Sequence, residues 1–384
     1  MPRYNWVFKN FTTSTNFTSS VLSASYRTGR QTYMDNWPGG SLIFTIKNDA
    51  NQAAGFTVND KIDLIDGIFV ADYQRFFVNE IQYVDYPGQV GLSTATITCT
   101  DALHRSGQNT INNLTLFAEQ CCEQLEQFPA SGQIAGSGYT IDGTTYGIGA
   151  SKALGLGGGY NGSVLQRINQ NMATERGIIW YNESTIYAVA RNKIYDKTMG
   201  LTFGRTPSST VIAYQEFQRI TLGQNFMNAV SIEPLNNTSY NTFSTNATST
   251  AAYGVRGYSL TTVDFTAAQG QGLGQFLANS QSDPQAVRFV VGFDDVAQNT
   301  TAINTFVGRW LGGFNAPVVV MPLEYKIQGS ATTYTVQCVI EGLEINMTPE
   351  KTSFTAYLSP AVYYQFFILN NATFGVLNTS RLGW

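Results

Sequence analysis

The sequence predicts a mainly β fold with an α+β insertion, and three observations support it. Short runs in which apolar and polar residues alternate, the period of a β-strand, dominate both ends of the chain. Helical periodicity is concentrated in the middle, with two short helical patterns closer to the C-terminus. Aromatic residues make up 13% of the chain and charged residues 12%, against about 25% charged in an average soluble domain. Asn, Thr, Ser and Gly take the place of charges, which suits strands and turns.

A chain of 384 residues is too long for one small core and predicts two or three domains. The pattern places an N-terminal β-domain at 1–105 and an α+β insertion domain at 106–195. A C-terminal β-rich domain with two short helices follows at 196–384.

In the N-terminal domain, residues 41–47 place Leu42, Phe44 and Ile46 on one face of a strand, and Asn48 then begins a turn. Further strands are predicted at 61–71, 75–84 and 93–100. Short strands at this spacing are typical of a barrel or a sandwich.

The period changes at residues 112–128, where apolar residues recur at i, i+3, i+4 and i+7 and predict an amphipathic helix. Cys121 and Cys122 would both lie on its apolar side. Asn112 or Asn113 would cap its first turn.

A glycine-rich segment at 131–162 separates this pattern from a second predicted helix at 163–175. Ser163 would cap that helix, and Gly177 lies just beyond its end. Residues 178–191 then predict a β-hairpin.

The C-terminal part returns to β pattern from about residue 210, and an Asn/Thr/Ser-rich stretch at 236–250 predicts a mobile loop. Two helices are predicted at 266–280 and 300–311. Strands are predicted at 287–293, 317–321, 332–345 and 352–358. The last stretch, from Phe366 to Trp384, predicts a tail that packs on a neighbour or on the domain itself.

The charge distribution argues against sequence-specific nucleic-acid binding. The net charge is −4, the isoelectric point is near 5.1, and Lys and Arg do not cluster. A dedicated binder needs a basic patch, because neutralising phosphates supplies most of its affinity. A mildly acidic wall would instead suit a channel through which DNA slides without sticking.

No apolar run of about 18 residues predicts a membrane span, and the N-terminal residues lack the apolar run expected of a signal peptide. Cytoplasmic assembly with reduced, mostly buried cysteines is therefore expected.

The sequence indicates no catalytic, cofactor-binding or metal-binding residue. His104 is the single histidine, and it follows Cys99 and Asp101. A Cys–His pair for catalysis needs an activating partner in a cleft, whereas residues at a strand end are better explained by a hydrogen-bonded strand terminus. The four cysteines lack the C-x-x-C spacing of a zinc site.

Two other patterns invite a chemical interpretation and have a simpler structural one. The glycine run at 155–162 lacks the G-K-S/T of a phosphate loop, so a flexible connection or a tight contact between chains is the better prediction. Paired carboxylates suggest glycosidase chemistry, which needs two carboxyls about 5 to 9.5 Å apart, but such pairs are common in turns. The pairs are Asp294/Asp295, Glu341/Glu344 and Asp63/Asp66.

The chain holds 21 Tyr, 24 Phe and 5 Trp, which would also suit sugar stacking or an outer-membrane barrel. A porin would need a signal peptide and regular alternation in segments of about ten residues. The helical patterns contradict that, so core and interface packing is the favoured interpretation.

Four stretches occur in an order that forms a recognisable pattern. The first is Phe76–Ile81 followed by Ala95–Leu103, two strands of which the second ends in an Asp-x-Leu step into a connecting helix. The second, Met172–Tyr181 closing at Arg191, has the order helix, Glu, Gly, strand, turn, strand, Arg. The others are Phe226–Ile232 with Tyr253–Arg256, and Phe367–Trp384. Together they resemble the minor tail proteins of long-tailed bacteriophages, the group that is similar to the baseplate hub or tail tip. The low charge and the glycine-rich segment at 131–162 depart from that family.

The resemblance implies two β-barrel-like tube domains with a small α+β domain between them. It also implies a homo-oligomer, a trimer in which three copies form a ring with pseudo-six-fold symmetry that matches a hexameric tail tube. Such a ring would be a structural virion component, assembled in the host cytoplasm, and not an enzyme. Its neighbours would be the tail tube or distal tail protein, the tape-measure protein, and tail fibre or spike proteins. Tape measure and DNA would pass through it.

Two alternatives remain open. One is a distal tail protein that forms hexamers, which subunit counting would separate from a trimer. The other is a carbohydrate-binding or carbohydrate-cleaving tailspike, which would bind host polysaccharide and depend on Asp294 or Asp295.

Overall fold

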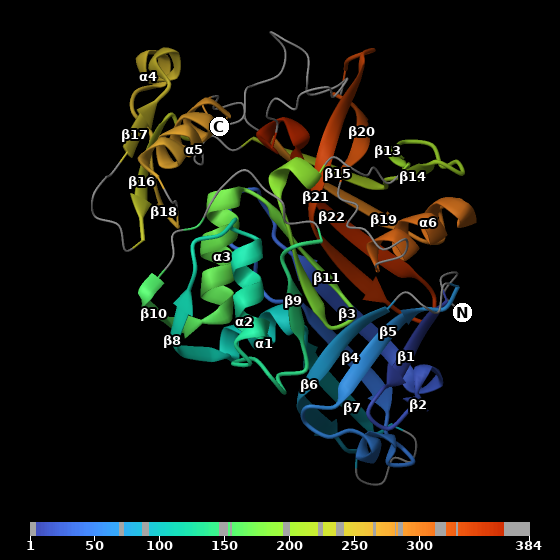
Figure 1. Cartoon of the computed structure of the whole chain (residues 1–384). Coiled ribbons are helices and arrows are strands. Elements are labelled where there is room, and N and C mark those ends of the chain that lie inside the picture. The colour runs from blue at the N-terminus through green and yellow to red at the C-terminus, as the bar shows by residue number, and fades with distance from the viewer. Residues whose placement is uncertain are drawn as a thin grey trace.

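The computed structural model describes residues 5–68, 73–86, 92–145, 153, 156–194, 200–221, 226–235, 242–263, 266–280, 282, 287–311, 320–327 and 329–364. Strands form most of the regular structure in these residues, so the prediction of a mainly β fold is confirmed. A large sheet curves through the molecule, helices cover part of one side of it, and a small lobe lies beside it (Figure 1). The predicted stretch from Phe366 to Trp384 lies outside the described residues.

The N-terminal strands curl around a core of aromatic rings. Their order is β3-β4-β7-β6-β5-β1-β2. Phe17 and Phe44 stack with ring centroids 5.2 Å apart, and Phe56 meets Phe17 edge-on at 4.9 Å. Burying each such ring stabilises the fold by about 1.5–3 kcal/mol. The strands are β1 (Trp6–Asn10), β2 (Thr15–Asn16), β3 (Val21–Gly29), β4 (Ser41–Lys47), β5 (Lys61–Asp66), β6 (Tyr73–Val84) and β7 (Thr94–Thr100). The strands predicted at 41–47, 75–84 and 93–100 are confirmed, and the one at 61–71 ends at Asp66.

The C-terminal strands form a second curved segment around its own aromatic core. Phe293 and Phe354 stack at 4.9 Å, and Phe306 of helix α6 (Thr300–Trp310) meets Phe293 edge-on at 5.3 Å. Asn299 caps this predicted helix by accepting a hydrogen bond from the Thr301 amide at 3.0 Å. The strands are β13 (Thr202–Gly204), β14 (Val211–Ala213), β15 (Glu216–Thr221), β19 (Val287–Asp294), β20 (Val320–Lys326), β21 (Thr333–Met347) and β22 (Thr352–Pro360).

The two β segments are one uninterrupted sheet, because β21 pairs with β3. Gly342 to Met347 of β21 run antiparallel to Ala24–Gly29 of β3, while the other side of β21 pairs with β22. The Trp6 indole N–H also donates to the Thr352 hydroxyl at 3.1 Å. Main-chain hydrogen bonds therefore join regions that are more than 300 residues apart in sequence.

The insertion packs helices and two small sheets against this large sheet. The predicted helix at 163–175 is α3 (Val164–Glu175), and the Ser163 hydroxyl caps it by accepting from the Gln166 amide. The predicted hairpin is β11 (Ile178–Asn182) with β12 (Thr185–Val189). The Asp-x-Leu step after β7 leads into α1 (Ala102–Gln108), as the resemblance implied. The strand β9 (Thr140–Asp142) pairs in parallel with β12.

The predicted helix at 112–128 is wrong. Its first part is the strand β8 (Thr110–Leu116), and a short 3-10 turn at Glu123–Glu126 and the helix α2 (Gln127–Ala130) follow. Asn113 has a φ of 54°, which breaks helical geometry. Pairing of β8 with a distant strand outweighs the local periodicity, although Cys121 and Cys122 are both buried as predicted.

That distant strand is β10 (Leu156–Ser163), the glycine run predicted to be a flexible connection or a contact between chains. The glycines serve close packing within the chain. A Cβ on Gly159, whose φ is +82°, would lie 2.2 Å from the Asn113 side-chain oxygen. Glycine lets the two backbones approach here.

The small lobe comprises β16 (Ala229–Pro234), β17 (Thr242–Thr245), α4 (Ala247–Tyr253), β18 (Gly257–Thr262) and α5 (Ala267–Ser280), the last a predicted helix. The described part of the predicted loop at 236–250 is a strand and the start of a helix, so that prediction is wrong there. Asn246 caps α4 by accepting from the Ser249 amide at 2.9 Å, and β17 is held by pairing with β16.

The remaining C-terminal strands agree with the predictions at 287–293, 332–345 and 352–358. The strand predicted at 317–321 starts at Val320 within the described residues.

Candidate functional site: a continuous sheet face and a buried junction

The outward face of the large sheet runs without interruption across both β segments. One row of directly paired residues crosses seven strands, from β19 to β6: Asp294, Ser353, Asn346, Ser25, Ile43, Thr98 and Glu80. At about 4.8 Å between strands, such a row spans roughly 29 Å. We call this surface the sheet face. Its width exists because β21 and β3 are in register.

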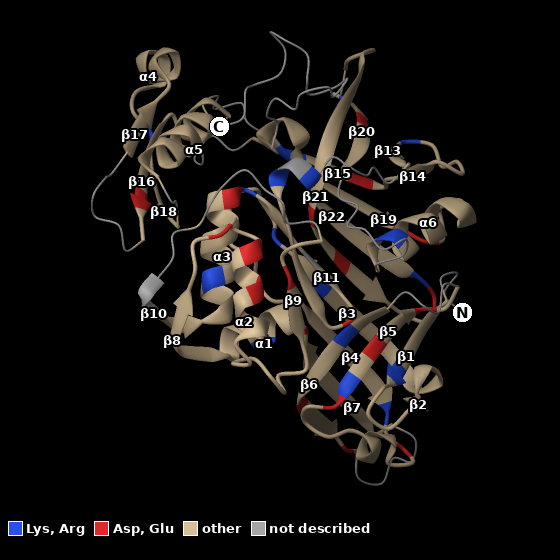
Figure 2. Ribbon diagram, in the orientation of Figure 1, with Lys and Arg blue, Asp and Glu red and all other residues tan. Residues whose placement is uncertain are grey.

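Side chains on the sheet face are mostly short and polar, and the charged ones nearly cancel. Its acidic residues are Glu80, Glu216, Asp294 and Glu344, and its basic residues are Arg27, Lys47 and Arg288. Arg27 and Glu344 form an ion pair at 3.2 Å across β3 and β21. The Thr45 and Thr96 hydroxyls lie 3.2 Å apart. Figure 2 likewise shows both signs of charge scattered over the ribbon without a large patch of either.

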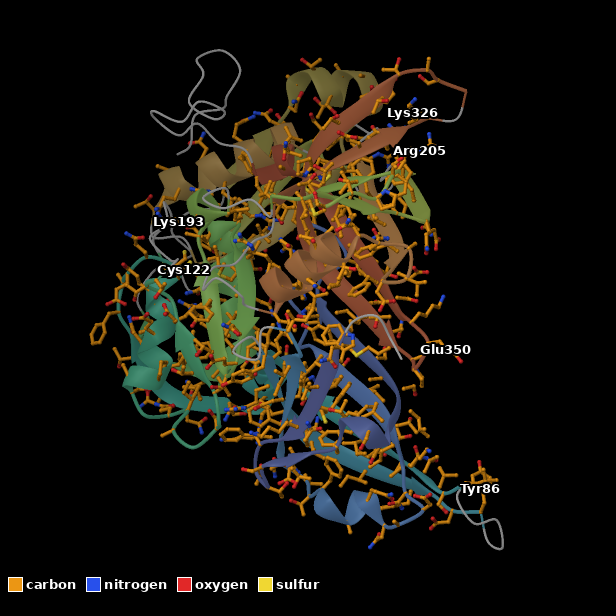
Figure 3. The ribbon with its side chains drawn as sticks, turned by 90° about the vertical axis from the view of Figure 1, so that its right-hand side faces the viewer. Tyr86, Cys122, Lys193, Arg205, Lys326 and Glu350 are labelled. Carbon is orange, nitrogen blue, oxygen red and sulfur yellow. The ribbon has the colours of Figure 1, made fainter. Side chains whose placement is uncertain are left out.

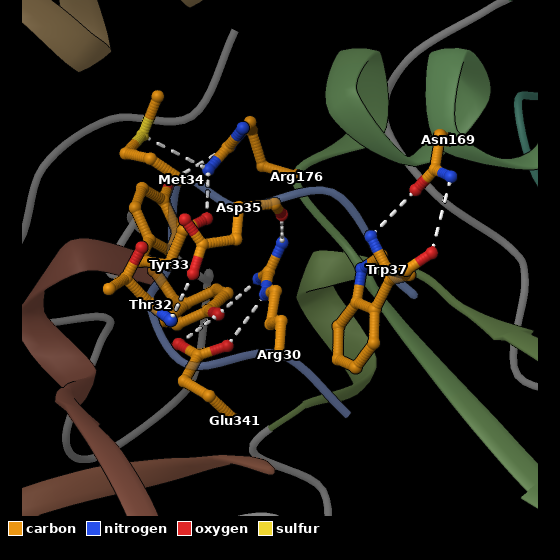
Figure 4. A network of polar contacts seen from close by, with 10 residues as sticks. Arg30, Thr32, Tyr33, Met34, Asp35, Trp37, Asn169, Arg176 and Glu341 are labelled. Atoms are coloured by element: carbon orange, nitrogen blue, oxygen red, sulfur yellow. Dashed lines mark hydrogen bonds and ion pairs between the residues drawn. The ribbon is translucent and has the colours of Figure 1, made fainter. Parts of the chain in front are cut away.

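Behind the β21–β3 seam lies a buried network, the junction, which joins the large sheet to the insertion (Figure 4). Arg30 follows β3 and donates to the Glu341 carboxylate of β21 at 2.8 Å and to the Tyr364 hydroxyl at 2.7 Å. The Tyr364 hydroxyl donates to the second Glu341 oxygen at 2.6 Å. The Arg30 guanidinium also lies 4.4 Å from the centre of the Trp37 ring. The remaining Arg30 nitrogen donates to the Asp35 backbone oxygen at 3.1 Å, so each guanidinium nitrogen has a partner.

Burial and pairing compete in setting the pKa values of the junction. Burial alone lowers the pKa of Arg30, but Glu341 and Tyr364 outweigh it, so the pKa stands above its usual value. Burial, and then the Glu341 carboxylate, raise the pKa of the Tyr364 hydroxyl, against the opposing effect of Arg30. Arg30 thus stays charged and Tyr364 stays neutral.

The same loop after β3 holds helix α3 of the insertion. Arg176, at the end of α3, donates to the Tyr33 backbone oxygen at 2.8 Å and stacks over the Tyr33 ring at 4.1 Å. The Trp37 amide donates to the Asn169 side-chain oxygen at 2.8 Å, and the Asn169 amide group donates back to the Trp37 carbonyl at 3.3 Å. Three distant parts of the chain therefore meet at residues 30–37.

A second buried ion pair joins β5 to β6, and hydrogen bonds beside it attach the insertion to these N-terminal strands. Arg75 donates to both Asp63 oxygens, at 2.7 and 3.0 Å. The Tyr181 hydroxyl of β11 donates to the Arg75 carbonyl, and Gln74 donates to the Tyr181 carbonyl at 3.2 Å. A bidentate pair of this kind fixes orientation as well as charge.

The structure does not bring His104 and Cys99 together as a catalytic pair. The Asp101 carboxylate accepts from the His104 amide at 2.8 Å and so caps α1. The His104 side chain is exposed, whereas Cys99 is buried and burial raises the pKa of its thiol. This geometry agrees with the structural interpretation, in which these residues form a hydrogen-bonded strand end and have no catalytic role.

The carboxylate pairs also have structural partners. Asp294 accepts from the Ala297 amide at 3.0 Å, and Asp295 from the Thr352 amide at 2.9 Å. Asp66 accepts from the Ile68 amide at 2.7 Å.

Among the described residues, no group of three or more His, Cys, Asp and Glu side chains is placed to bind a metal ion. Within the same residues, no helix has the length and apolar character needed to cross a membrane.

Sequence reasoning missed the sheet face and the junction. Strand period revealed which residues of each strand point outward, but not which strands are neighbours. Arg30 and Glu341 are 311 positions apart, and neither lies in a motif that signals a partner.

No protein-family model and no curated protein matches the chain. Among solved structures, it is similar to a tail protein from Neisseria meningitidis, with a TM-score of 0.59 and 9% identity over 94% of this chain and 98% of that one. It is also similar to the 43 kDa tail protein of prophage MuSo2 from Shewanella oneidensis, with a TM-score of 0.54 and 11% identity over 94% and 98%. The resemblance to phage tail proteins is thereby confirmed at the level of the fold.

Proposed function

We propose that this chain is a structural subunit of a phage tail, a hub or tip protein that forms a ring at the distal end of the tail tube. Its fold matches tail proteins over 94% of its length. The observation that carries the proposal is the sheet face, because a single subunit offers a wall about 29 Å wide that crosses seven strands. Catalysis is not part of this role.

The chemistry of the sheet face suits a channel wall. A wall rich in Lys and Arg would bind DNA through its phosphates and hold it, because counterion release favours binding. The sheet face instead carries four acidic and three basic residues, among them the Arg27–Glu344 pair, and between them many Ser and Thr side chains. Tape-measure protein and DNA would slide along such a surface.

The oligomer we propose is a homotrimer. Three copies of a chain with two β segments would place six such segments around one axis, which matches the six-fold tail tube that the family resemblance implies. The domain limits of 1–105, 106–195 and 196–384 stay part of this proposal, and β3 and β21 join the first and the third of these domains in one sheet. Partners in the virion would be the tube or distal tail protein above, and fibre or spike proteins below.

Native mass spectrometry of the purified chain, followed by negative-stain class averages, tests the proposal. We expect a trimer whose averages show a central channel. A hexamer would favour a distal tail protein, and a chain that stays monomeric up to high micromolar concentration would overturn the ring. Binding to host polysaccharide on a glycan array would point to an adsorption protein instead.

A further inference from the structure

The hairpin formed by β6 and β7 projects from the molecule and carries exposed apolar side chains at its end. Tyr83, Tyr86 and Leu92 are 51%, 49% and 53% exposed. Soluble proteins seldom expose several large apolar groups together unless they contact a partner. We call the described residues 80–86 and 92–94 the hairpin tip.

The hairpin tip is acidic. Glu80 and Asp85 are exposed, and the sequence from 79 to 94 contains no Lys or Arg. Neither carboxylate takes part in an ion pair among the described residues. The tip therefore offers two aromatic rings beside a net negative charge.

The end of the β20–β21 hairpin has the opposite character. A hollow of about 190 Å³ lies beside β13 and β20 and is lined by residues that include Arg205, Tyr325 and Lys326. A cavity of about 150 Å³ is enough to hold a benzene ring. The exposed Ile327 and Tyr334 border this end, and the rings of Tyr334 and Tyr325 stack at 5.4 Å. We call it the basic hollow.

The positive charges of the basic hollow are only partly balanced within the described part of the chain. Arg205 and Lys326 are exposed and form no ion pair there. Glu324 also lines the hollow and leaves an excess of one positive charge. The hollow thus fits an aromatic side chain that arrives together with a carboxylate.

The two surfaces lie at opposite ends of the molecule. Figure 3 places Tyr86 at the lower end, and Arg205 and Lys326 at the upper end, with all three toward the same side. One copy therefore cannot join its own tip to its own hollow. A head-to-tail contact between different surfaces is what closes a ring of identical subunits.

We propose that the hairpin tip of one copy docks into the basic hollow of the next. Tyr86 or Tyr83 would fill the hollow, and Asp85 would face Arg205 and Lys326. The proposal rests on the ring inferred above and names the contact that closes it. The partner is a second copy of this chain.

Charge reversal tests the contact. The variants Asp85→Arg and Arg205→Asp/Lys326→Asp each place like charges against each other, and we expect each to weaken self-association at least about tenfold. A chain that carries all three substitutions restores opposite charges at every contact and should associate nearly as the natural chain does. Glu350→Arg is the matched control, because Glu350 is exposed and lies away from both ends. Sedimentation velocity over a concentration series measures the association.

The apolar part is tested separately with Tyr86→Ser against Phe243→Ser, since Phe243 is 65% exposed on the small lobe. We expect Tyr86→Ser to weaken association and Phe243→Ser to leave it unchanged. Thermal melts confirm that every variant folds. If the natural chain forms a ring and the three charge variants associate equally well, the docking mode is wrong while the ring stands. If the natural chain never self-associates, both proposals fall.

Discussion

Charged side chains are used differently at the junction and on the sheet face. At the junction, Arg30 and Glu341 are almost fully buried and meet at 2.8 Å, with Tyr364 completing the network. On the sheet face, Arg27 and Glu344 lie in the same two regions of the chain, at 3.2 Å, but water reaches both. The two pairs sit close together in sequence and differ mainly in burial, so they separate the effect of burial from that of pairing. We therefore expect the loss of one partner to destabilise the fold strongly at the buried junction and only weakly on the exposed sheet face.

Removing the Glu341 carboxylate should have the largest effect. Glu341→Ala leaves the Arg30 guanidinium buried without its counter-charge, and we expect a loss of about 3–5 kcal/mol in the free energy of unfolding. The matched change on the sheet face, Glu344→Ala, should cost about 1 kcal/mol or less. Urea unfolding followed by circular dichroism measures both. Equal losses would mean that burial does not distinguish the two pairs.

A smaller effect is expected at Asp101, the cap of α1, where burial raises the pKa to about 6 from 3.8 while the His104 and Gly40 backbone hydrogen bonds oppose it. The folded state then holds a proton that the unfolded chain has already lost between about pH 4 and pH 6. Stability from this group is present below pH 4 and is lost as pH rises through 6, by at most about 3 kcal/mol at 1.36 kcal/mol per pH unit.

Asp101→Asn tests this, because Asn caps a helix as well as Asp does but does not titrate. We expect the variant to be more stable than the natural chain at pH 7.5 and similar to it at pH 4. Asp49→Asn, at an exposed turn carboxylate, controls for the loss of one negative charge. If the free energies of unfolding of the natural chain and of Asp101→Asn change in parallel from pH 4 to 7.5, the raised pKa of Asp101 is contradicted.

Sequence reasoning succeeded where structure is local and failed where it is not. The helix α3 was predictable because Ser163 caps it and its apolar side repeats within one segment. The segment 112–128 has similar periodicity, yet β8 forms because Tyr160 and its neighbours in β10 offer a strand to pair with. The sheet face depends on the register between β3 and β21, and no property of either strand alone specifies it. The mainly β class and the tail-protein fold were therefore predictable, whereas the sheet face and the junction were not.

On the sheet face itself, the Arg27–Glu344 pair should respond to salt. Arg27 is 51% exposed, so Arg27→Ala should lower the free energy of unfolding by about 1 kcal/mol or less. The difference from the natural chain should shrink in 1 M salt, where screening acts over about 3 Å. Arg30→Ala serves as the buried counterpart and should keep most of its larger loss in salt. A loss for Arg27→Ala that persists unchanged in 1 M salt would argue against an exposed electrostatic contact.

The smallest effect on stability, and the most direct test of the wall, comes from adding positive charge to the sheet face. Ser25 and Thr98 lie in one row with Ile43 between them. Ser25→Lys/Thr98→Lys should change the free energy of unfolding by no more than about 0.5 kcal/mol per site, because both side chains point outward.

The same double variant should gain affinity for double-stranded DNA at low salt, with a steeper dependence of log affinity on log salt, by about 0.9 for each added phosphate contact. Fluorescence anisotropy with a labelled duplex measures this. Thr13→Lys/Ser209→Lys adds the same charge at exposed positions away from the sheet face and should gain less. That result would support the proposal that a near-neutral, hydroxyl-rich sheet face binds DNA only weakly. Equal gains for the two double variants would show that net charge alone sets the affinity for DNA, and that the composition of the sheet face has no special part in it.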